Sequence, residues 1–124
     1  TTFGGNPLAM RAALTTIEVM EEDQLLRNAE RRGAQLRELL TAALTGVPGY
    51  LELRGKGLML GIALDRPCGV LVGQALEAGL VLNVTADTVV RLLPPLIFTE
   101  EDVQELTSTL VPLIRTFLSS SARP

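Results

Sequence analysis

The first residues of the chain combine the groups that can hold a bound phosphate. Thr1 and Thr2 carry hydroxyls, and the glycines at positions 4 and 5 let the backbone approach a ligand closely. Asn6 followed by Pro7 predicts a helix start, because Asn is a good N-cap and Pro is tolerated at the first helical position. Helix N-termini attract anions through free N–H groups and the helix dipole. A phosphate near Thr2 is therefore physically reasonable, although a plain glycine turn before a capped helix explains the same residues without a ligand.

Arg91 is the second residue whose type and position suggest binding. It lies near the end of an apolar run that is typical of a strand, and a rigid Pro94-Pro95 corner follows it. A guanidinium group presents a planar fork of donors that matches the two oxygens of a carboxylate. The sequence thus predicts that Arg91 holds a carboxylate. A salt bridge to Asp65 or Asp87 is the alternative that the residues alone leave open.

Covalent and acid–base catalysis have weaker support. Lys56 is the only lysine, and therefore the only side-chain amine here that could form a Schiff base. It lies between two glycines in a predicted hairpin turn, where nothing would shield the amine from water, and we interpret it as a turn residue. Glu21, Glu22 and Asp23 form an acidic run at a predicted helix junction, where capping and the helix dipole explain them better than catalysis.

Composition excludes several other classes. The 124 residues carry a net charge of −3 and 3% aromatic residues, and no basic run occurs, so nucleic-acid binding has little support. A single cysteine, Cys68, and the absence of His rule out an intrachain disulfide and the usual zinc sets. No apolar run approaches the roughly 20 residues of a membrane-spanning helix, and the first residues show no targeting pattern. These features predict a cytoplasmic protein that binds neither metal, nucleic acid nor membrane.

The apolar content suggests that another domain or subunit covers part of this chain. Hydrophobic residues make up 47% of the sequence, and the mean hydropathy is +0.31, which is high for a free-standing domain of this size. We therefore interpret the sequence as part of a larger protein. A self-contained α+β module that binds a small molecule or a protein partner is the alternative.

Periodic apolar residues predict four helices and four short strands. The helices are expected at about 7–21, 23–44 and 68–78 and from 99 onward, and the strands at about 51–54, 58–64, 80–84 and 88–92. Asp23 is expected to cap the second helix, whose arginines (Arg27, Arg31, Arg32 and Arg37) are expected on solvated faces. Thr99 with Asp102 resembles a capping box. The predicted fold class is α+β, in which long helices precede a small sheet of three to four mainly antiparallel strands covered by helices on one face.

Three blocks of sequence, in order, resemble one enzyme family. Residues 1–9 (Thr-Thr-Phe-Gly-Gly-Asn-Pro-Leu-Ala), 54–61 (Arg-Gly-Lys-Gly-Leu-Met-Leu-Gly) and 90–96 (Val-Arg-Leu-Leu-Pro-Pro-Leu) are similar to segments of the class III, ornithine-type aminotransferases. The resemblance covers essentially the whole chain. Residues 83–85 (Asn-Val-Thr) are closer to the acetylornithine branch of that family.

The resemblance implies a fold-type I homodimer that uses pyridoxal 5′-phosphate to transfer an amino group between an amino acid and a 2-oxo acid. It implies that Thr2 binds the cofactor phosphate of the neighbouring subunit, that Thr1 touches substrate and that Arg91 holds a substrate carboxylate. The Schiff-base lysine of the family lies upstream of such a loop, so no residue of this chain is expected to be catalytic. Alone, the chain is expected to be inactive and not to bind the cofactor covalently.

The implied domain organisation has four parts. Residues 1–6 form a cofactor-phosphate loop on the large-domain side, 7–45 connecting helices, 46–118 a C-terminal small domain and 119–124 a frayed tail; the large domain and a second subunit are the partners. In the acetylornithine branch the reaction converts N2-acetylornithine and 2-oxoglutarate into N-acetylglutamate semialdehyde and glutamate, in arginine biosynthesis. Ornithine, succinylornithine and 4-aminobutyrate are the alternative amine donors.

Overall fold

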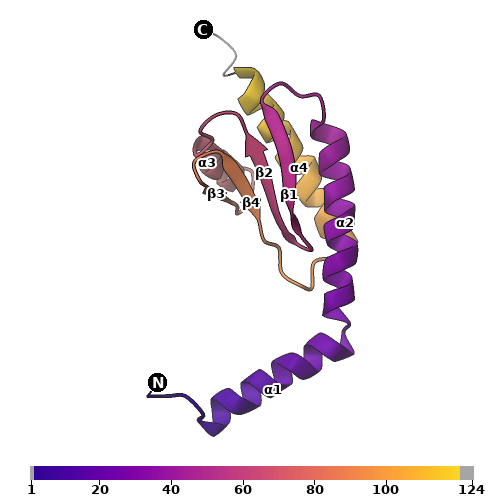
Figure 1. Cartoon of the computed structure of the whole chain (residues 1–124), viewed down its shortest axis with the longest axis vertical. Helices are drawn as coiled ribbons and strands as arrows, with labels where there is room; N and C mark the ends of the chain where they lie inside the picture. The colour runs from indigo at the N-terminus through magenta and orange to yellow at the C-terminus, as the bar shows by residue number, and fades with distance from the viewer. Residues whose placement is uncertain (1, 121–124) are drawn as a thin grey trace.

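The computed structural model describes residues 2–120, which form four α-helices and one four-stranded sheet (Figure 1). The helices are α1 (Pro7–Glu22), α2 (Leu25–Leu44), α3 (Val70–Glu77) and α4 (Glu100–Ser120), and the strands are β1 (Tyr50–Lys56), β2 (Met59–Leu64), β3 (Asn83–Thr85) and β4 (Val89–Leu92). This arrangement confirms the predicted α+β class. α4 includes the first two residues of the segment predicted as a tail, and residues 121–124 lie outside the described part. No helix within residues 2–120 is long and apolar enough to cross a membrane.

All strand pairs are antiparallel, and the strand order is β1-β2-β4-β3. Helices cover one face of the sheet, and the other face carries no helix (Figure 1). Because successive side chains of a strand point to opposite faces, alternate residues of the central strands enter the core. These buried strand residues pack with apolar residues of α2, α3 and α4 in one cluster: Leu60, Ile62, Leu64, Val90 and Leu92 with Leu36, Leu40, Leu44, Leu71, Val103, Leu110 and Ile114. α2 therefore shares its core with segment 46–118, while the four-part division predicted from the sequence stays a prediction.

The start of α2 differs from the expectation. Asp23 does not cap this helix: it ends α1, with its N–H bonded to the Val19 carbonyl at 3.0 Å. Gln24 precedes α2 in the left-handed conformation, at φ 52, and makes no side-chain cap bond. Left-handed backbone is uncommon for a residue other than glycine, and the change of direction between the two helices occurs here. Sequence patterns for caps could not detect it, because Gln is not a typical capping residue.

The β1–β2 hairpin is held against α2 by close backbone packing and by one arginine. Gly33 of α2 lies against Gly57 of the hairpin, and a Cβ at position 33 would overlap the Gly57 carbonyl group. Arg37, one turn further along α2, donates to the carbonyl oxygens of Gly55 at 2.7 Å and Leu53 at 3.4 Å. The expectation of a solvated Arg37 was therefore wrong. α2 therefore positions the β1–β2 edge of the sheet through the close packing of Gly33 on Gly57 and through the hydrogen bonds of Arg37.

α1 stands apart from the rest of the molecule. It leaves the body at its junction with α2 (Figure 1) and buries none of its own residues. Its exposed large apolar side chains are Leu8, Met10, Leu14, Ile17 and Val19. An apolar surface of this kind is typical of a segment that packs against another domain or subunit, in agreement with the interpretation of the high hydropathy.

The close packing of α2 predicts opposite effects of one substitution at two helical glycines. Gly33→Ala should lower the free energy of unfolding by about 1–3 kcal/mol, because the added methyl overlaps backbone atoms that cannot move away freely. Gly73→Ala, in α3, is the matched control: no atom lies within 4 Å of its added Cβ. There Ala should be neutral or stabilise by up to about 1 kcal/mol through helix propensity. Urea unfolding of the two variants measures both effects, and equal stability changes would contradict the described packing.

Candidate functional site

Thr2 is exposed at the start of a loop that leads into α1. Asn6 caps this helix: its Oδ1 accepts from the Ala9 N–H at 2.9 Å, and its Nδ2 donates to the Phe3 carbonyl at 2.7 Å. Gly5 has φ +77, which favours glycine, and the space where a Cβ would lie has no atom within 4 Å. The loop thus presents a hydroxyl and a capped helix start to open space. Thr1, the predicted substrate contact, lies outside the described residues.

β4 places Arg91 on the open face of the sheet. Its neighbours Val90 and Leu92 are buried in the core, so the alternation of the strand sends Arg91 to the opposite face, where it is exposed. Within residues 2–120 the ion pairs formed are Arg32–Glu100, Arg54–Glu52 and Arg66–Asp65, none of which involves Arg91. The alternative pairing of Arg91 with Asp65 or Asp87 is therefore not formed. A pocket of about 220 Å³ adjoins Arg91, and its lining includes Val81, Leu93, Pro94 and Phe98.

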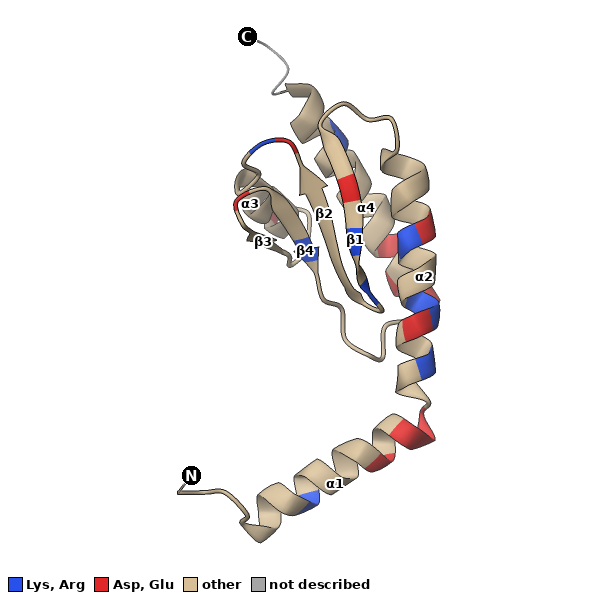
Figure 2. Cartoon of the chain, viewed as in Figure 1, with Lys and Arg blue, Asp and Glu red and all other residues tan. Residues whose placement is uncertain are grey.

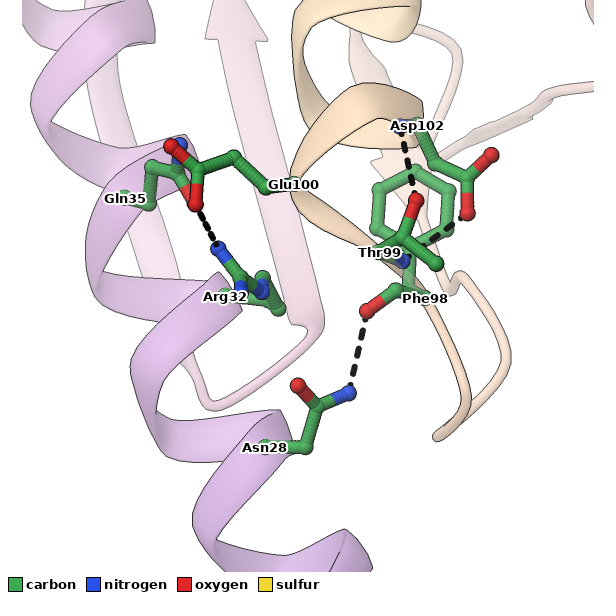
Figure 3. Close-up of polar contacts among 7 residues, drawn as sticks. All are labelled: Asn28, Arg32, Gln35, Phe98, Thr99, Glu100 and Asp102. Carbon is green, nitrogen blue, oxygen red and sulfur yellow. Dashed lines mark hydrogen bonds and ion pairs between the residues drawn. The ribbon is translucent and has the colours of Figure 1, made fainter.

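Asn28 ties the segment that follows Arg91 to α2 (Figure 3). Its side-chain amide donates to the carbonyl oxygens of Leu96 at 2.7 Å and Phe98 at 3.0 Å. The Phe98 N–H in turn donates to the Pro95 carbonyl at 3.0 Å. One side chain of α2 thus holds the turn after the proline corner. The corner follows the end of β4 at Leu92, so Asn28 anchors to α2 the segment that leaves this end of the strand.

Arg32, about one turn further along α2, holds the start of α4 (Figure 3). Its Nη1 lies 3.1 Å from Oε2 of Glu100 and 2.7 Å from Oε1 of Gln35. The side chain is only 13% exposed, and its Nε is buried without a hydrogen-bond partner in the described part of the chain. The expectation of a solvated Arg32 was wrong for this reason. The helix pattern missed it because a guanidinium can reach past the edge of its own helical face.

The capping box at the start of α4 is confirmed (Figure 3). The Thr99 N–H donates to Asp102 Oδ2 at 2.8 Å, and the Asp102 N–H donates to the Thr99 hydroxyl at 3.1 Å. Hydrogen bonding to Thr99, chiefly to its backbone N–H, holds the pKa of the Asp102 carboxyl below its usual 3.8. A lowered folded-state pKa favours the ionised form, so this stabilisation is present above pH 3.8 and is lost as the pH falls below it. At neutral pH the box keeps α4 anchored beside the Asn28 turn.

The chain does not bring its candidate residues together. Thr2 lies at the far end of α1, while Arg91 lies on the sheet (Figure 1). Lys56 is exposed beside the hairpin turn, and acidic residues gather at the α1–α2 junction, away from the sheet (Figure 2). No group of three His, Cys, Asp or Glu within residues 2–120 is placed to hold a metal ion. The structure thus places an exposed hydroxyl beside a capped helix start and an exposed guanidinium on the sheet, at two separate places.

Comparison with known proteins gives the class to which these features belong. The family model described as Aminotransferase class-III matches residues 1–114. The chain is 56% identical over 119 residues to acetylornithine aminotransferase 1 of Bordetella bronchiseptica, which covers 96% of this chain and 30% of the relative. It is similar to the crystal structure of the ornithine aminotransferase from Toxoplasma gondii, with a TM-score of 0.88 and 34% identity over 97% of this chain and 30% of that one. The acetylornithine aminotransferase from Elizabethkingia anophelis gives a TM-score of 0.84 and 30% identity over 94% of this chain and 32% of that one.

The chain therefore belongs to the class III aminotransferases. Within that family it is similar to proteins named acetylornithine aminotransferase, such as those from Bordetella bronchiseptica and Elizabethkingia anophelis. It spans about 30% of the length of the curated relatives that it matches. The match confirms the resemblance of the three sequence blocks, and it places the described fold within a larger protein architecture.

Removal of the Asn28 side chain should change both the stability of the whole chain and the hydrogen exchange of one backbone amide. Asn28→Ala should lower the free energy of unfolding by about 0.5–1.5 kcal/mol, since one exposed and one half-buried carbonyl group lose a donor. The Phe98 amide should also exchange its hydrogen faster, because the turn that it closes is no longer tied to α2. Asn83→Ala, an exposed position on the open face of the sheet, is the matched control and should change stability by less than about 0.5 kcal/mol. Unchanged exchange at Phe98 would show that Asn28 does not hold the turn.

Proposed function

We propose that this chain is the C-terminal segment of a pyridoxal-phosphate-dependent acetylornithine aminotransferase. It would supply a carboxylate-binding arginine and a phosphate-binding threonine to active sites that other parts of the protein complete. The amine donor would be N2-acetylornithine and the amine acceptor 2-oxoglutarate, and the protein would act in the cytoplasm as a homodimer. The proposal assigns no catalytic residue to this chain.

The exposed, unpaired guanidinium of Arg91 is the observation that carries the proposal. Arg91 forms no ion pair within residues 2–120, and it lies near a strand end that the proline corner and Asn28 hold in position. Its guanidinium is therefore available to bind the carboxylate of a ligand. Binding there would orient the substrate and hold its reacting carbon in place, which lowers the entropic part of the barrier. 2-Oxoglutarate carries a carboxylate next to the carbon that gains the amino group, whereas N2-acetylornithine loses the amino group at its terminal carbon and carries its carboxylate at the other end of the molecule.

The residues of the opening loop suit the phosphate of the proposed cofactor. Thr2 offers an exposed hydroxyl, and the helix start after Asn6 favours negative charge. When bound, pyridoxal phosphate supplies an electron sink for the substrate carbon. The chain would contribute only the phosphate contact, since Lys56, its single lysine, lies in an exposed hairpin. The distance of this loop from Arg91 within one chain supports a role for Thr2 in the site of a second copy.

The names of the curated relatives favour acetylornithine over the other amine donors, since relatives named acetylornithine aminotransferase share 56% and 41% of the aligned residues. The solved structures do not separate the donors: one titled ornithine aminotransferase shares 34%, and one titled acetylornithine aminotransferase shares 30%. Ornithine remains the second candidate, because the fold of this chain is also similar to the structure titled ornithine aminotransferase. Use of succinylornithine or 4-aminobutyrate as the donor would require different residues in the other parts of the protein, where the end of the donor opposite the transferred amino group is recognised.

A chimeric enzyme tests the proposal directly. The matching segment of the Bordetella bronchiseptica relative is replaced by the aligned 119 residues of this chain, and amino transfer from N2-acetylornithine to 2-oxoglutarate is measured. The chimera should be active, and Arg91→Gln within it should lower kcat/KM by about 10- to 100-fold, the loss of a charge-assisted bidentate contact. A folded, cofactor-loaded chimera without activity would refute the proposal.

Two control substitutions separate the carboxylate contact from general effects of charge. Arg66→Gln removes a half-buried arginine that is already paired with Asp65 at 2.6 Å, and it should leave kcat/KM unchanged. Lys56→Met should also leave activity in place, because this lysine is proposed to have no covalent role. A loss of activity in the Lys56 variant equal to that in the Arg91 variant would contradict the assignment of roles.

A further inference from the structure

Asn83 lies beside Arg91 on the open face of the sheet. In the register of the sheet, Arg91 of β4 pairs with Gly61 of β2 on one side and with Asn83 of β3 on the other. Residues directly opposite each other in adjacent strands share a face, so the side chain of Asn83 points to the same side as that of Arg91. Both residues are exposed. Because Gly61 has no side chain, Asn83 is the cross-strand neighbour whose side chain can contact the guanidinium.

The β2 side of Arg91 is apolar. Val89, two residues before Arg91 on β4, faces the same side and is only 6% exposed. A Cβ added to Gly61 would lie 3.1 Å from Cγ1 of Val89, so a methyl group of Val89 already takes up the space over the glycine. The pairing with Gly61 therefore brings no side-chain acceptor to the guanidinium, whereas the pairing with Asn83 brings an amide oxygen.

The reach of the two side chains decides which of their atoms can meet. Cβ atoms of directly opposite residues lie about 4.5–5.5 Å apart. The amide of Asn83 ends close to its own Cβ, whereas the Nη groups of Arg91 lie at the end of a long stem and its Nε lies nearer to the strand. The amide oxygen of Asn83 can thus reach Nε–H of Arg91 while the two Nη groups remain accessible. A carboxylate bound by the two Nη groups leaves Nε–H available for this contact.

Asn83 offers an acceptor that carries no charge. An amide oxygen accepts a hydrogen bond without neutralising Arg91, whereas an aspartate at this position would pair with the guanidinium and compete with a bound carboxylate. Within residues 2–120 the ion pairs do not include Arg91, and the side-chain hydrogen bonds include neither Asn83 nor Arg91. Both groups are therefore available to meet around a ligand.

We infer that Asn83 is a positioning residue for the carboxylate-binding arginine: its amide oxygen accepts from Nε–H of Arg91 and orients the guanidinium so that both Nη groups face the ligand. A guanidinium oriented in this way loses less side-chain freedom on binding than one that is held only by its own stem. The inference rests on the proposed function, because Asn83 acts through Arg91. Asn83 itself touches no reacting atom and is assigned no catalytic role.

Kinetics of the chimeric enzyme, loaded with its cofactor, measure this role. Asn83→Ala should raise KM for 2-oxoglutarate about 2- to 10-fold, as expected for the loss of one hydrogen bond, and should leave kcat within about twofold. Asn83→Asp should raise KM further, because the added carboxylate neutralises Arg91. In an Arg91→Gln background Asn83→Ala should have no further effect, since the residue through which it acts is gone. An unchanged KM in Asn83→Ala would overturn the inference.

Thr85→Val is the matched control. It removes a hydroxyl from the same strand and the same face, but Thr85 pairs with Val89 instead of Arg91. KM for 2-oxoglutarate should therefore stay unchanged in this variant. A rise equal to that of Asn83→Ala would show that any change on β3 disturbs the site, and it would contradict a specific role of Asn83.

The 124-residue chain provides a second measurement that needs no amino transfer. With acetate added as a simple carboxylate, the Nε–H proton of Arg91 is followed by NMR. Its exchange with water should be about 2- to 10-fold slower in the unchanged chain than in Asn83→Ala, and equal exchange would overturn the inference. An inactive chimera together with this difference would reject the proposed function alone, whereas an active chimera with an unchanged KM in Asn83→Ala would reject only the role of Asn83.

Discussion

The alternation of β4 is the constraint on which the account of this chain depends. Val90 and Leu92 are fully or almost fully buried against the helices, so Arg91 between them must point to the open face. A shift of one residue in the pairing with β2 would bury the guanidinium and expose both apolar neighbours. The core therefore fixes the position of the charge, and the same register aligns Arg91 with Gly61 and Asn83. The exposure of this cationic group on the open face follows from how the other face is packed.

α2 is the element that keeps this sheet in place at both ends. Near its middle, Gly33 and Arg37 hold the β1–β2 hairpin, and one turn or more before them Asn28 holds the turn that follows β4. The sheet that carries Arg91 is held by these contacts with α2, whereas α1 buries none of its residues. α1 carries Thr2 away from the sheet and leaves its own apolar side chains uncovered. Such a division suits a segment that completes one site on its sheet and contributes to another through its first residues.

The sequence predicted the elements of the fold well because their signals are local. Alternating and helical apolar patterns, Gly79 after α3 and the Thr99–Asp102 box all act within a few residues of one another. Contacts between distant residues gave no such signal: Asn28 and Arg32 reach partners 68 to 70 positions away. For the site, Thr2 and Arg91 were identified through type, neighbours and family resemblance.

The central claim, that Thr2 and Arg91 of one chain serve different active sites, is tested most directly by a heterodimer. Thr2→Val and Arg91→Gln are placed in separate subunits of the chimeric enzyme, and the mixed dimer is isolated with two affinity tags. If Thr2 acts in the partner's site, one of the two sites is intact, and the mixed dimer should recover about half of the unmodified activity. Activity no higher than that of the two parent homodimers would show that both residues act in the same subunit, and it would contradict the account.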